Sequence, residues 1–304
     1  MKPGSLVALV TPMTPSGDLD LDSLRGLLRW HVEAGTDGMV ALGTTGESSV
    51  LTFDERARVL DVCVEELKGK MPLMVGTGTI DADAVIKMNQ QALDAGADSC
   101  LVVTPYYTKP TQRGLVEWFT KVADAVDLPL LLYNVPGRTA VDMRPETVAQ
   151  LARHPRIFGI KEATGELERV EQLRRLIRDD DFMLFSGEDS NAHDFTLRGG
   201  DGVISVLSNV VPAEQARVFK AALTGKHDEA QELHEPLALL AKRLFLQANP
   251  IPVKYAVASL GRMASAQRLP LTELDPEFQP VLLDAMADVG LEIGSYSKVS
   301  MGAK

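Results

Sequence analysis

The chain has 304 residues, of which 45% are hydrophobic and 24% charged, a composition typical of globular proteins. It contains 31 Lys and Arg residues against 42 Asp and Glu residues, giving a net charge of −11, and no run of basic residues that would neutralise phosphates. These features exclude nucleic acid as an expected partner.

The two cysteines and the N-terminal residues bear on the cellular location. Cys63 and Cys100 form no CxxC pair, and a chain of this length needs no disulfide framework. The apolar stretch from Leu6 to Val10 is too short for the core of a signal peptide or for a membrane span. We therefore expect a cytoplasmic protein that does not associate with membranes.

Eight short apolar runs are predicted to be β-strands, and segments with helical periodicity separate them. The strands are expected at Ser5–Thr11, Gly38–Leu42, Leu73–Gly76, Cys100–Thr104, Leu128–Tyr133, Phe158–Lys161, Met183–Ser186 and Val203–Leu207. The helices between them include Leu21–Ala34, Phe53–Leu67, Ala82–Ala95 and Leu167–Ile177. Because the strands are continuously apolar, both of their faces should be buried, as in a parallel sheet covered by helices. This α/β pattern predicts a (β/α)8 TIM barrel, and a doubly wound open sheet, which usually has fewer strands, is the alternative.

The pattern changes after about residue 224. Only segments with helical periodicity follow, at Glu229–Leu246, Val253–Leu260 and Pro276–Val289. We therefore predict a catalytic barrel over residues 1–224 and a small C-terminal helical domain over residues 225–294. Residues 295–304 are mostly small and polar, which indicates a flexible tail.

Chemically reactive side chains follow several of the predicted strands. In a TIM barrel, the C-terminal ends of the strands and the loops after them carry the active site. Four of these ends are rich in polar residues, namely Gly43–Ser48, Thr104–Tyr107, Tyr133–Thr139 and Lys161–Ala163. We therefore expect the functional site at this end of the barrel.

Lys161 is the most informative of these residues. It ends an apolar strand, so we expect its amine in a poorly solvated place, and desolvation lowers the pKa of an ammonium group. A neutral lysine attacks a ketone and forms a Schiff base. A structural lysine paired with Glu162 or with another carboxylate is the alternative interpretation, and position alone does not separate the two.

The neighbouring strand ends supply hydroxyl groups rather than metal ligands. Tyr133, Tyr107 and Thr45 are candidates for the proton relay that Schiff-base formation requires at the carbonyl oxygen. Four of the five histidines lie in or beside predicted helices, and only His193 falls near a strand end. Because no HxH motif or other ligand cluster occurs, we expect no metal ion.

Two features predict the binding of carboxylates. The segment Gly43–Gly46 offers backbone N–H groups and hydroxyls to one carboxylate, because glycine permits a turn that points successive amides at an anion. Arg138, in a loop rich in turn-forming residues, offers a planar guanidinium to a second carboxylate. Neither Gly43–Gly46 nor Gly76–Gly78 has the pattern of a nucleotide-binding loop. These features predict a pocket for a small, doubly anionic adduct.

Three motifs resemble those of the dihydrodipicolinate synthase (4-hydroxy-tetrahydrodipicolinate synthase) family, within the pyruvate-dependent class I aldolases. They are Gly43–Glu47, Tyr133–Thr139 and Gly159–Gly165, and they occur in the family's order and at compatible spacing. The segment Asn249–Lys254 supports the resemblance beyond the barrel. The likeness covers about residues 4–290.

The resemblance implies an activity and an assembly. The family condenses pyruvate with L-aspartate 4-semialdehyde on the route to diaminopimelate and lysine, without a metal or an organic cofactor. Its fold is a (β/α)8 barrel with a helical C-terminal domain. Its usual assembly is a homotetramer built as a dimer of dimers, and a dimer is the alternative here.

The resemblance also implies roles for individual residues. Lys161 matches the Schiff-base lysine, Tyr133 the proton donor and acceptor, and Thr45 the relay threonine. Tyr107 matches a relay tyrosine that reaches the site of the neighbouring subunit. The substrate-binding residues implied in this way are Thr44 and Thr45 for the pyruvate carboxylate, Arg138 for the semialdehyde carboxylate, and Gly187 and Ile204 as pocket-lining residues.

Regulation is the one property in which this sequence departs from part of the family. Lysine-sensitive members have polar and ionisable side chains around a pocket at the dimer interface. The aligned positions here are Ser48, Ser49, Phe53, Arg56, Ile80, Ala84 and Tyr106. Phe53, Ile80 and Ala84 cannot hydrogen-bond or pair with the ammonium groups of lysine, so we expect weak or absent inhibition by lysine.

Two other functions compete with this hypothesis. A sister aldolase, such as N-acetylneuraminate lyase or a 2-keto-3-deoxy sugar acid aldolase, would use the same lysine on a polyol. Arg138 favours instead a short aldehyde that carries a carboxylate. A non-catalytic barrel that only senses an oxo acid is disfavoured because Lys161 and all three hydroxyl candidates are present.

Overall fold

The computed structural model describes residues 1–178 and 181–294. The tail predicted at residues 295–304 lies outside the described residues. Within the described residues, no helix combines the length and the apolar character that crossing a membrane requires.

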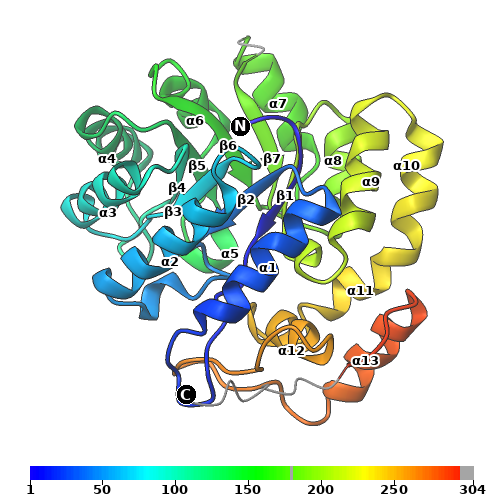
Figure 1. The fold of residues 1–304 in the computed structure, drawn as a ribbon. Helices are drawn as coiled ribbons and strands as arrows, with labels where there is room; N and C mark the ends of the chain where they lie inside the picture. Colours follow the sequence, from blue (N-terminus) through cyan, green and yellow to red (C-terminus); the bar gives the residue numbers. More distant parts are fainter. Residues whose placement is uncertain (179–180, 295–304) are drawn as a thin grey trace.

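Eight parallel strands form a closed barrel in chain order (Figure 1). The strands are β1 (Gly4–Ala8), β2 (Gly38–Ala41), β3 (Leu73–Gly76), β4 (Ser99–Val103), β5 (Leu130–Asn134), β6 (Ile157–Glu162), β7 (Met183–Ser186) and β8 (Gly202–Ser205). Because β8 pairs with β1, the sheet has no free edge. The predicted TIM barrel is confirmed, and the open-sheet alternative is wrong.

The closure between β1 and β8 depends on two glycines. Gly4 and Gly202 are register partners, and both have positive φ angles, of 151° and 125°. A Cβ atom added to Gly202 would lie 2.0 Å from the carbonyl oxygen of Gly4. Only residues without a side chain allow the first and last strands to approach this closely.

Helices surround the barrel and continue after its last strand. The helices are α1 (Leu21–Ala34), α2 (Phe53–Leu67), α3 (Ala82–Ala95), α4 (Gln112–Ala125), α5 (Pro136–Thr139), α6 (Pro145–Leu151), α7 (Glu168–Leu176), α8 (Ala192–Leu197), α9 (Pro212–Leu223), α10 (His227–His234), α11 (Ala238–Arg243), α12 (Ile251–Ser259) and α13 (Gln279–Asp288). Short 3-10 helices occupy η1 (Ser48–Val50), η2 (Leu207–Asn209) and η3 (Glu235–Leu237).

Local sequence determines where the helices begin. Helix α2 starts with a capping box, in which the Thr52 hydroxyl accepts from the Glu55 N–H and the Glu55 carboxylate accepts from the Thr52 N–H. Helix α1 has Asp20 as its N-cap, and Gly35 ends it in the left-handed conformation. These contacts satisfy backbone groups that a helix leaves unpaired at its ends.

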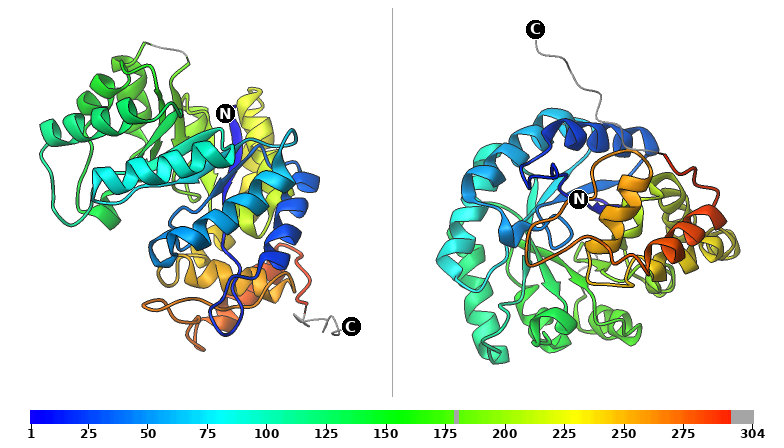
Figure 2. Two further views of the ribbon diagram at one scale, coloured as in Figure 1. Left: turned by 60° about the vertical axis from the view of Figure 1, so that its left-hand side comes forward. Right: turned by 90° about the horizontal axis from the view of Figure 1, so that it is seen from below.

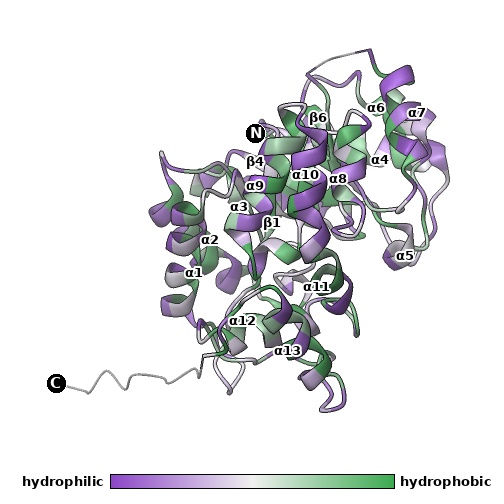
Figure 3. Cartoon of the chain, turned by 90° about the vertical axis from the view of Figure 1, so that its right-hand side faces the viewer, coloured by the Kyte–Doolittle hydropathy of each residue, from purple (hydrophilic) through white to green (hydrophobic). Residues whose placement is uncertain are grey.

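The hydrophobic core has two layers. One lies between the strands and the helices, and the other fills the barrel itself with Leu6, Val40, Met74, Leu101 and Phe185 among its members. Along each strand the side chains alternate between these layers, so every second residue points into the barrel. Polar residues cover much of the outside of the molecule, and Figure 3 shows hydrophilic residues on the outward face of α10.

The C-terminal helices lie at the end of the barrel where the strands finish. Figures 1 and 2 show α12 and α13 on the side opposite the N-terminus, and the orange chain between these two helices crosses part of the barrel end. The prediction of one helical segment over Glu229–Leu246 is wrong in detail, because η3 separates α10 from α11. Pro236 lies in η3 and has no backbone N–H to continue an α-helical ladder.

Candidate active site

Lys161 and Tyr133 lie side by side inside the barrel, near the C-terminal ends of β6 and β5. They are register partners in the parallel ladder, and both are buried. The Nζ atom of Lys161 lies 4.6 Å from the centroid of the Tyr133 ring. Because side chains alternate along a strand, the neighbouring Ile160 belongs to the layer between strands and helices. The sheet register therefore brings together an amine and a phenol that are 28 positions apart in the sequence.

The surroundings of Lys161 favour its neutral form. Burial lowers the pKa of Lys161 to about 8, although the negative charges of Asp189 and Glu188 act in the opposite direction. Within the described part of the chain, Lys161 forms no ion pair. Glu162 points away from it and accepts hydrogen bonds from the Asn134 Nδ2 atom at 3.1 Å and the Thr164 N–H at 2.9 Å. The alternative of a structural Lys161–Glu162 pair is therefore wrong.

Gly187 makes room for the lysine. A Cβ atom added to Gly187 would lie 3.0 Å from Lys161 Cε and 2.6 Å from the Ala163 Cβ atom. Any side chain at this position would push against the aliphatic part of Lys161. The predicted place of Gly187 beside the pocket agrees with this geometry.

The loop after β2 forms a tight turn with free N–H groups. The Gly46 and Glu47 N–H groups donate to the Gly43 and Thr44 carbonyls, both at 3.1 Å. The N–H groups of Thr44 and Thr45 have no hydrogen-bond partner among residues 1–178 and 181–294. Two adjacent free amides at a strand end form a suitable site for a carboxylate.

The Thr44 side chain acts on the Tyr133 phenol. Burial raises the pKa of Tyr133 to about 12, while the Arg138 charge and a hydrogen bond with Thr44 act to lower it. The hydroxyl of Thr45 is buried and accepts a hydrogen bond from the Asn249 Nδ2 atom at 2.9 Å. The predicted relay ran through Thr45, whereas this geometry favours Thr44 as the partner of Tyr133. The difference arises because the turn directs the two adjacent side chains to different neighbours.

Arg138 lies at the mouth of the site on the short helix α5. Its Nη2 atom donates to the Asn249 carbonyl at 3.2 Å. An inner cavity of about 50 Å³ contains Lys161, and a wider cavity of about 470 Å³ lies beside it. Arg138 lines both cavities, together with Thr44 and Val135. The guanidinium is therefore placed where a substrate would pass from the wider cavity to the lysine.

Two predicted site residues lie away from the inner cavity. Tyr107 is 86% exposed, has a φ angle of 69° and lines neither cavity. Ile204 is fully buried in the barrel core with Tyr133 and Phe185 and does not line the inner cavity. A catalytic role for Tyr107 in a neighbouring subunit and a lining role for Ile204 stay predictions.

Sequence reasoning missed three residues that the structure places at the site. Glu188 lines the inner cavity, and its neighbour Asp189 is buried and accepts from the Val206 and Leu207 N–H groups. Two consecutive carboxylates after an apolar strand were a usable signal at positions 188 and 189. Asn249 also lines the cavity, but no pattern in the sequence indicates that it contacts a residue 204 positions away.

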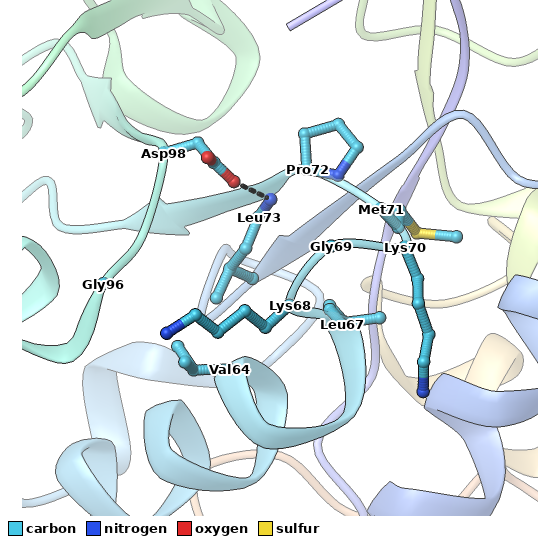
Figure 4. Close-up of a pocket in the computed structure, with 10 residues that line it drawn as sticks. All are labelled: Val64, Leu67, Lys68, Gly69, Lys70, Met71, Pro72, Leu73, Gly96 and Asp98. Atoms are coloured by element: carbon cyan, nitrogen blue, oxygen red, sulfur yellow. Dashed lines mark hydrogen bonds between the residues drawn. The ribbon is translucent and has the colours of Figure 1, made fainter.

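A cavity of similar size lies at the opposite end of the barrel, where β3 begins, and Figure 4 shows the residues that line it. It measures about 450 Å³ and lies beside the start of β3, where the Asp98 carboxylate accepts from the Leu73 N–H at 2.7 Å. The side chains of Lys68 and Lys70 extend away from each other at its edge. Because TIM-barrel chemistry occurs at the C-terminal ends of the strands, this cavity is not a candidate active site.

Metal ligands are not grouped anywhere in the described ranges. Within residues 1–178 and 181–294, no cluster of three or more His, Cys, Asp or Glu side chains could hold a metal ion. His193, the histidine nearest to a predicted strand end, stacks on His234 with ring centroids 3.9 Å apart. Its Nε2 atom lies 2.8 Å from Gln231 Oε1, which gives it a structural partner in α10.

Comparison with known proteins gives consistent matches over nearly the whole chain. The model of the dihydrodipicolinate synthetase family matches residues 1–288. The 4-hydroxy-tetrahydrodipicolinate synthase of Alcanivorax borkumensis is 49% identical over 288 residues, which cover 95% of this chain and 98% of that protein.

Two solved structures are similar in fold as well as in sequence. The crystal structure of dihydrodipicolinate synthase from Aquifex aeolicus is 39% identical with a TM-score of 0.94, covering 96% of this chain and all (100%) of that chain. The chloride-inhibited dihydrodipicolinate synthase from Acinetobacter baumannii, complexed with pyruvate, is 41% identical. Its TM-score is also 0.94, and the match covers 96% of this chain and 100% of that chain.

Proposed function

The chain belongs to the dihydrodipicolinate synthetase family, and from this premise we propose that it is a lyase of class I aldolase type acting on pyruvate and L-aspartate 4-semialdehyde. The reaction is that of the 4-hydroxy-tetrahydrodipicolinate synthases, in the biosynthesis of diaminopimelate and lysine. The observation that carries the proposal is the buried Lys161 amine, with its lowered pKa, beside the Tyr133 phenol. The pyruvate bound in the similar Acinetobacter baumannii structure supports the choice of the first substrate.

The first half of the reaction takes place at Lys161. The neutral amine attacks the ketone of pyruvate, and loss of water gives the Schiff base. The free N–H groups of Thr44 and Thr45 are suited to hold the pyruvate carboxylate during this step. Tyr133 donates and accepts the protons that the carbonyl oxygen requires, and the Thr44 hydroxyl beside it continues the relay.

The second half joins the two substrates. Loss of a proton converts the imine into an enamine, whose carbon attacks the aldehyde of the semialdehyde. Arg138, exposed at the mouth of the inner cavity, provides a bidentate partner for the carboxylate of this second substrate. The amine of the semialdehyde then closes the ring and releases Lys161. A polyol substrate would instead need several hydroxyl and amide partners, which favours the synthase over the sugar-acid aldolases.

Trapping the Schiff base tests this proposal. Borohydride added with pyruvate should attach a reduced pyruvate group to the peptide that contains Lys161, as detected by mass spectrometry. Lys161→Met should abolish the label, and Lys121→Met serves as the control in which an exposed lysine far from the cavity is removed. An unlabelled Lys161 in the unaltered protein, or turnover of N-acetylneuraminate in place of L-aspartate 4-semialdehyde, would overturn the proposal.

The assembly, location and regulation belong to the same proposal. We place the protein in the cytoplasm as a homotetramer, with the dimer as the smallest active form. Four of the seven positions aligned with the family's lysine pocket, Ser48, Ser49, Arg56 and Tyr106, line the wider cavity. Phe53, Ile80 and Ala84 do not line it, and their side chains carry no group that binds an ammonium. Steady-state assays with millimolar lysine should therefore give weak inhibition or none.

A further inference from the structure

Glu188 is a carboxylate without a partner at the active site. It follows β7, where its N–H donates to the Ser186 hydroxyl at 3.1 Å and its carbonyl accepts from that hydroxyl at 3.2 Å. These two bonds hold the backbone of Glu188 beside the inner cavity, which the residue lines. Its side-chain oxygens form no hydrogen bond or ion pair with any residue that the structure describes. The carboxylate is therefore available to a ligand.

The other carboxylates near Lys161 already accept hydrogen bonds from the protein. Asp189 is buried and accepts from two backbone N–H groups at 2.8 and 2.9 Å. Glu162 accepts from the Asn134 side chain and the Thr164 N–H on the outer side of β6. Glu188 is the one carboxylate among the described residues that line the inner cavity. It faces the charges of both Lys161 and Arg138, which act on its pKa.

The second substrate needs an anion at this position as well as a cation. L-Aspartate 4-semialdehyde carries a carboxylate and an ammonium group on the same carbon atom. Arg138 satisfies the carboxylate, and an ammonium that leaves water needs a charged acceptor to offset its desolvation. We propose that Glu188 binds this ammonium group and accepts its proton before ring closure. This inference rests on the function proposed above.

Ring closure requires that proton transfer. The ammonium has no lone pair, so one of its protons must move to the Glu188 carboxylate before the nitrogen attacks. The lone pair then forms a bond to the carbon of the Lys161 Schiff base, and a second proton moves from this nitrogen to the Lys161 nitrogen. The bond between that carbon and Lys161 breaks, its electrons return to the lysine, and the ring nitrogen forms the new C=N bond and loses its last proton to water.

Burial suits Glu188 to this step. Burial and the nearby Asp189 charge raise the pKa of Glu188, while Lys161 and Arg138 act to lower it. A carboxylate with a raised pKa is a stronger proton acceptor than one in water. Glu188 also acts to raise the pKa of Lys161, so removing its charge does not disfavour the neutral amine that forms the Schiff base.

Glu188→Gln separates this role from Schiff-base formation and from folding. With pyruvate and borohydride, the variant should label Lys161 as the unaltered protein does. With L-aspartate 4-semialdehyde added, turnover should fall about 100-fold, within the range that a positioned proton acceptor contributes. The unclosed adduct of pyruvate and semialdehyde should accumulate on Lys161, where borohydride traps it. Glu188→Asp, which keeps a carboxylate, should recover part of the turnover.

Succinic semialdehyde provides the matched substrate, because it has the aldehyde and the carboxylate but no amine. Borohydride should trap the adduct of pyruvate and succinic semialdehyde on Lys161 equally in Glu188→Gln and in the unaltered protein. Glu168→Gln changes an exposed residue of α7 and serves as the control, which should behave as the unaltered protein in every assay. Unchanged turnover in Glu188→Gln, or equal losses with both aldehydes, would overturn the role of Glu188. Failure of pyruvate to label Lys161 in the unaltered protein would overturn the proposed function itself.

Discussion

At the scale of single residues, burial changes the protonation of Lys161 enough to decide whether it reacts. With a pKa of about 8, about one amine in ten is neutral at pH 7, whereas an unburied lysine would have fewer than about one in a thousand. The rate at which borohydride traps pyruvate on Lys161 should therefore rise with pH and level off above about 8. Mass spectrometry of the labelled peptide measures this profile. A midpoint near the ordinary lysine value would contradict the desolvated setting.

The two adjacent threonines should contribute unequally. The Thr44 side chain acts to lower the pKa of Tyr133, whereas the Thr45 hydroxyl accepts a hydrogen bond from the Asn249 Nδ2 atom. Thr44→Val, which removes only the hydroxyl, should lower kcat by about 100-fold, because it interrupts proton transfer. Thr45→Val should lower kcat less than Thr44→Val does. Its main effect should be to raise KM for pyruvate, because the loop that binds the pyruvate carboxylate loses its hydrogen bond to Asn249. Equal losses of kcat in steady-state assays of the two variants would argue for a relay through Thr45.

The same pair marks a limit of sequence reasoning at this scale. The positions of Lys161 and Tyr133 at the ends of β6 and β5 could be predicted, because the apolar runs that mark the strands are local patterns. The choice between Thr44 and Thr45 depends on the direction in which a tight turn points two neighbouring side chains. That direction is determined by contacts with Asn249 and Tyr133, which are distant in the sequence and leave no periodic signal.

At the scale of elements, a buried ion pair joins the catalytic loop to the C-terminal helices. Lys254 of α12 and Glu47 of the loop after β2 have fully buried side chains 2.5 Å apart. Arg268 adds a backbone N–H donor to the same carboxylate at 3.1 Å. Glu47 also has a φ angle of 54°, a strained conformation that surrounding contacts must maintain. The loop that carries Thr44 and Thr45 is therefore held in part from α12.

Removing one partner of this ion pair should lower the stability of the protein. Lys254→Met leaves Glu47 buried without a countercharge, which should lower the free energy of unfolding by about 3–5 kcal/mol. The double variant Lys254→Met/Glu47→Gln should recover part of that loss, because no unpaired charge remains. Urea unfolding followed by circular dichroism measures both. Lys121→Met, which breaks an exposed pair with Asp83, is the control and should leave the unfolding midpoint unchanged. A loss no larger than that of the control would contradict the argument.

At the scale of the whole molecule, the barrel could be predicted because each of its units is local. Eight continuously apolar runs at regular intervals already require strands that are buried on both faces. The close approach of Gly4 and Gly202 at the closure, and the way the C-terminal helices reach the active site, could not be predicted, since both depend on contacts between residues far apart in the chain. The division into domains at residue 224 stays a prediction. Helix α10, which follows that boundary, packs on α9 and α8.

The exposure of Tyr107 gives a test of the assembly. A tyrosine that is 86% exposed and lines neither cavity cannot serve the Lys161 of its own chain, so a catalytic role requires a second copy. Tyr107→Phe and Lys161→Met should each be impaired alone. In a mixed dimer, one site combines the intact Lys161 of one chain with the partner subunit's Tyr107.

Refolding the two variants together at equal amounts should therefore restore activity. Random assortment makes half of the dimers mixed, each with one complete site out of two, so about a quarter of the unaltered activity is expected if the dimer is isologous. Lys161→Met mixed with Thr44→Val is the control, because both changes affect the site of the same chain and no complete site arises in any combination. Analytical ultracentrifugation verifies that mixed assemblies form. Activity in the first mixture that stays at the level of the control would show that each subunit works without its partner's tyrosine.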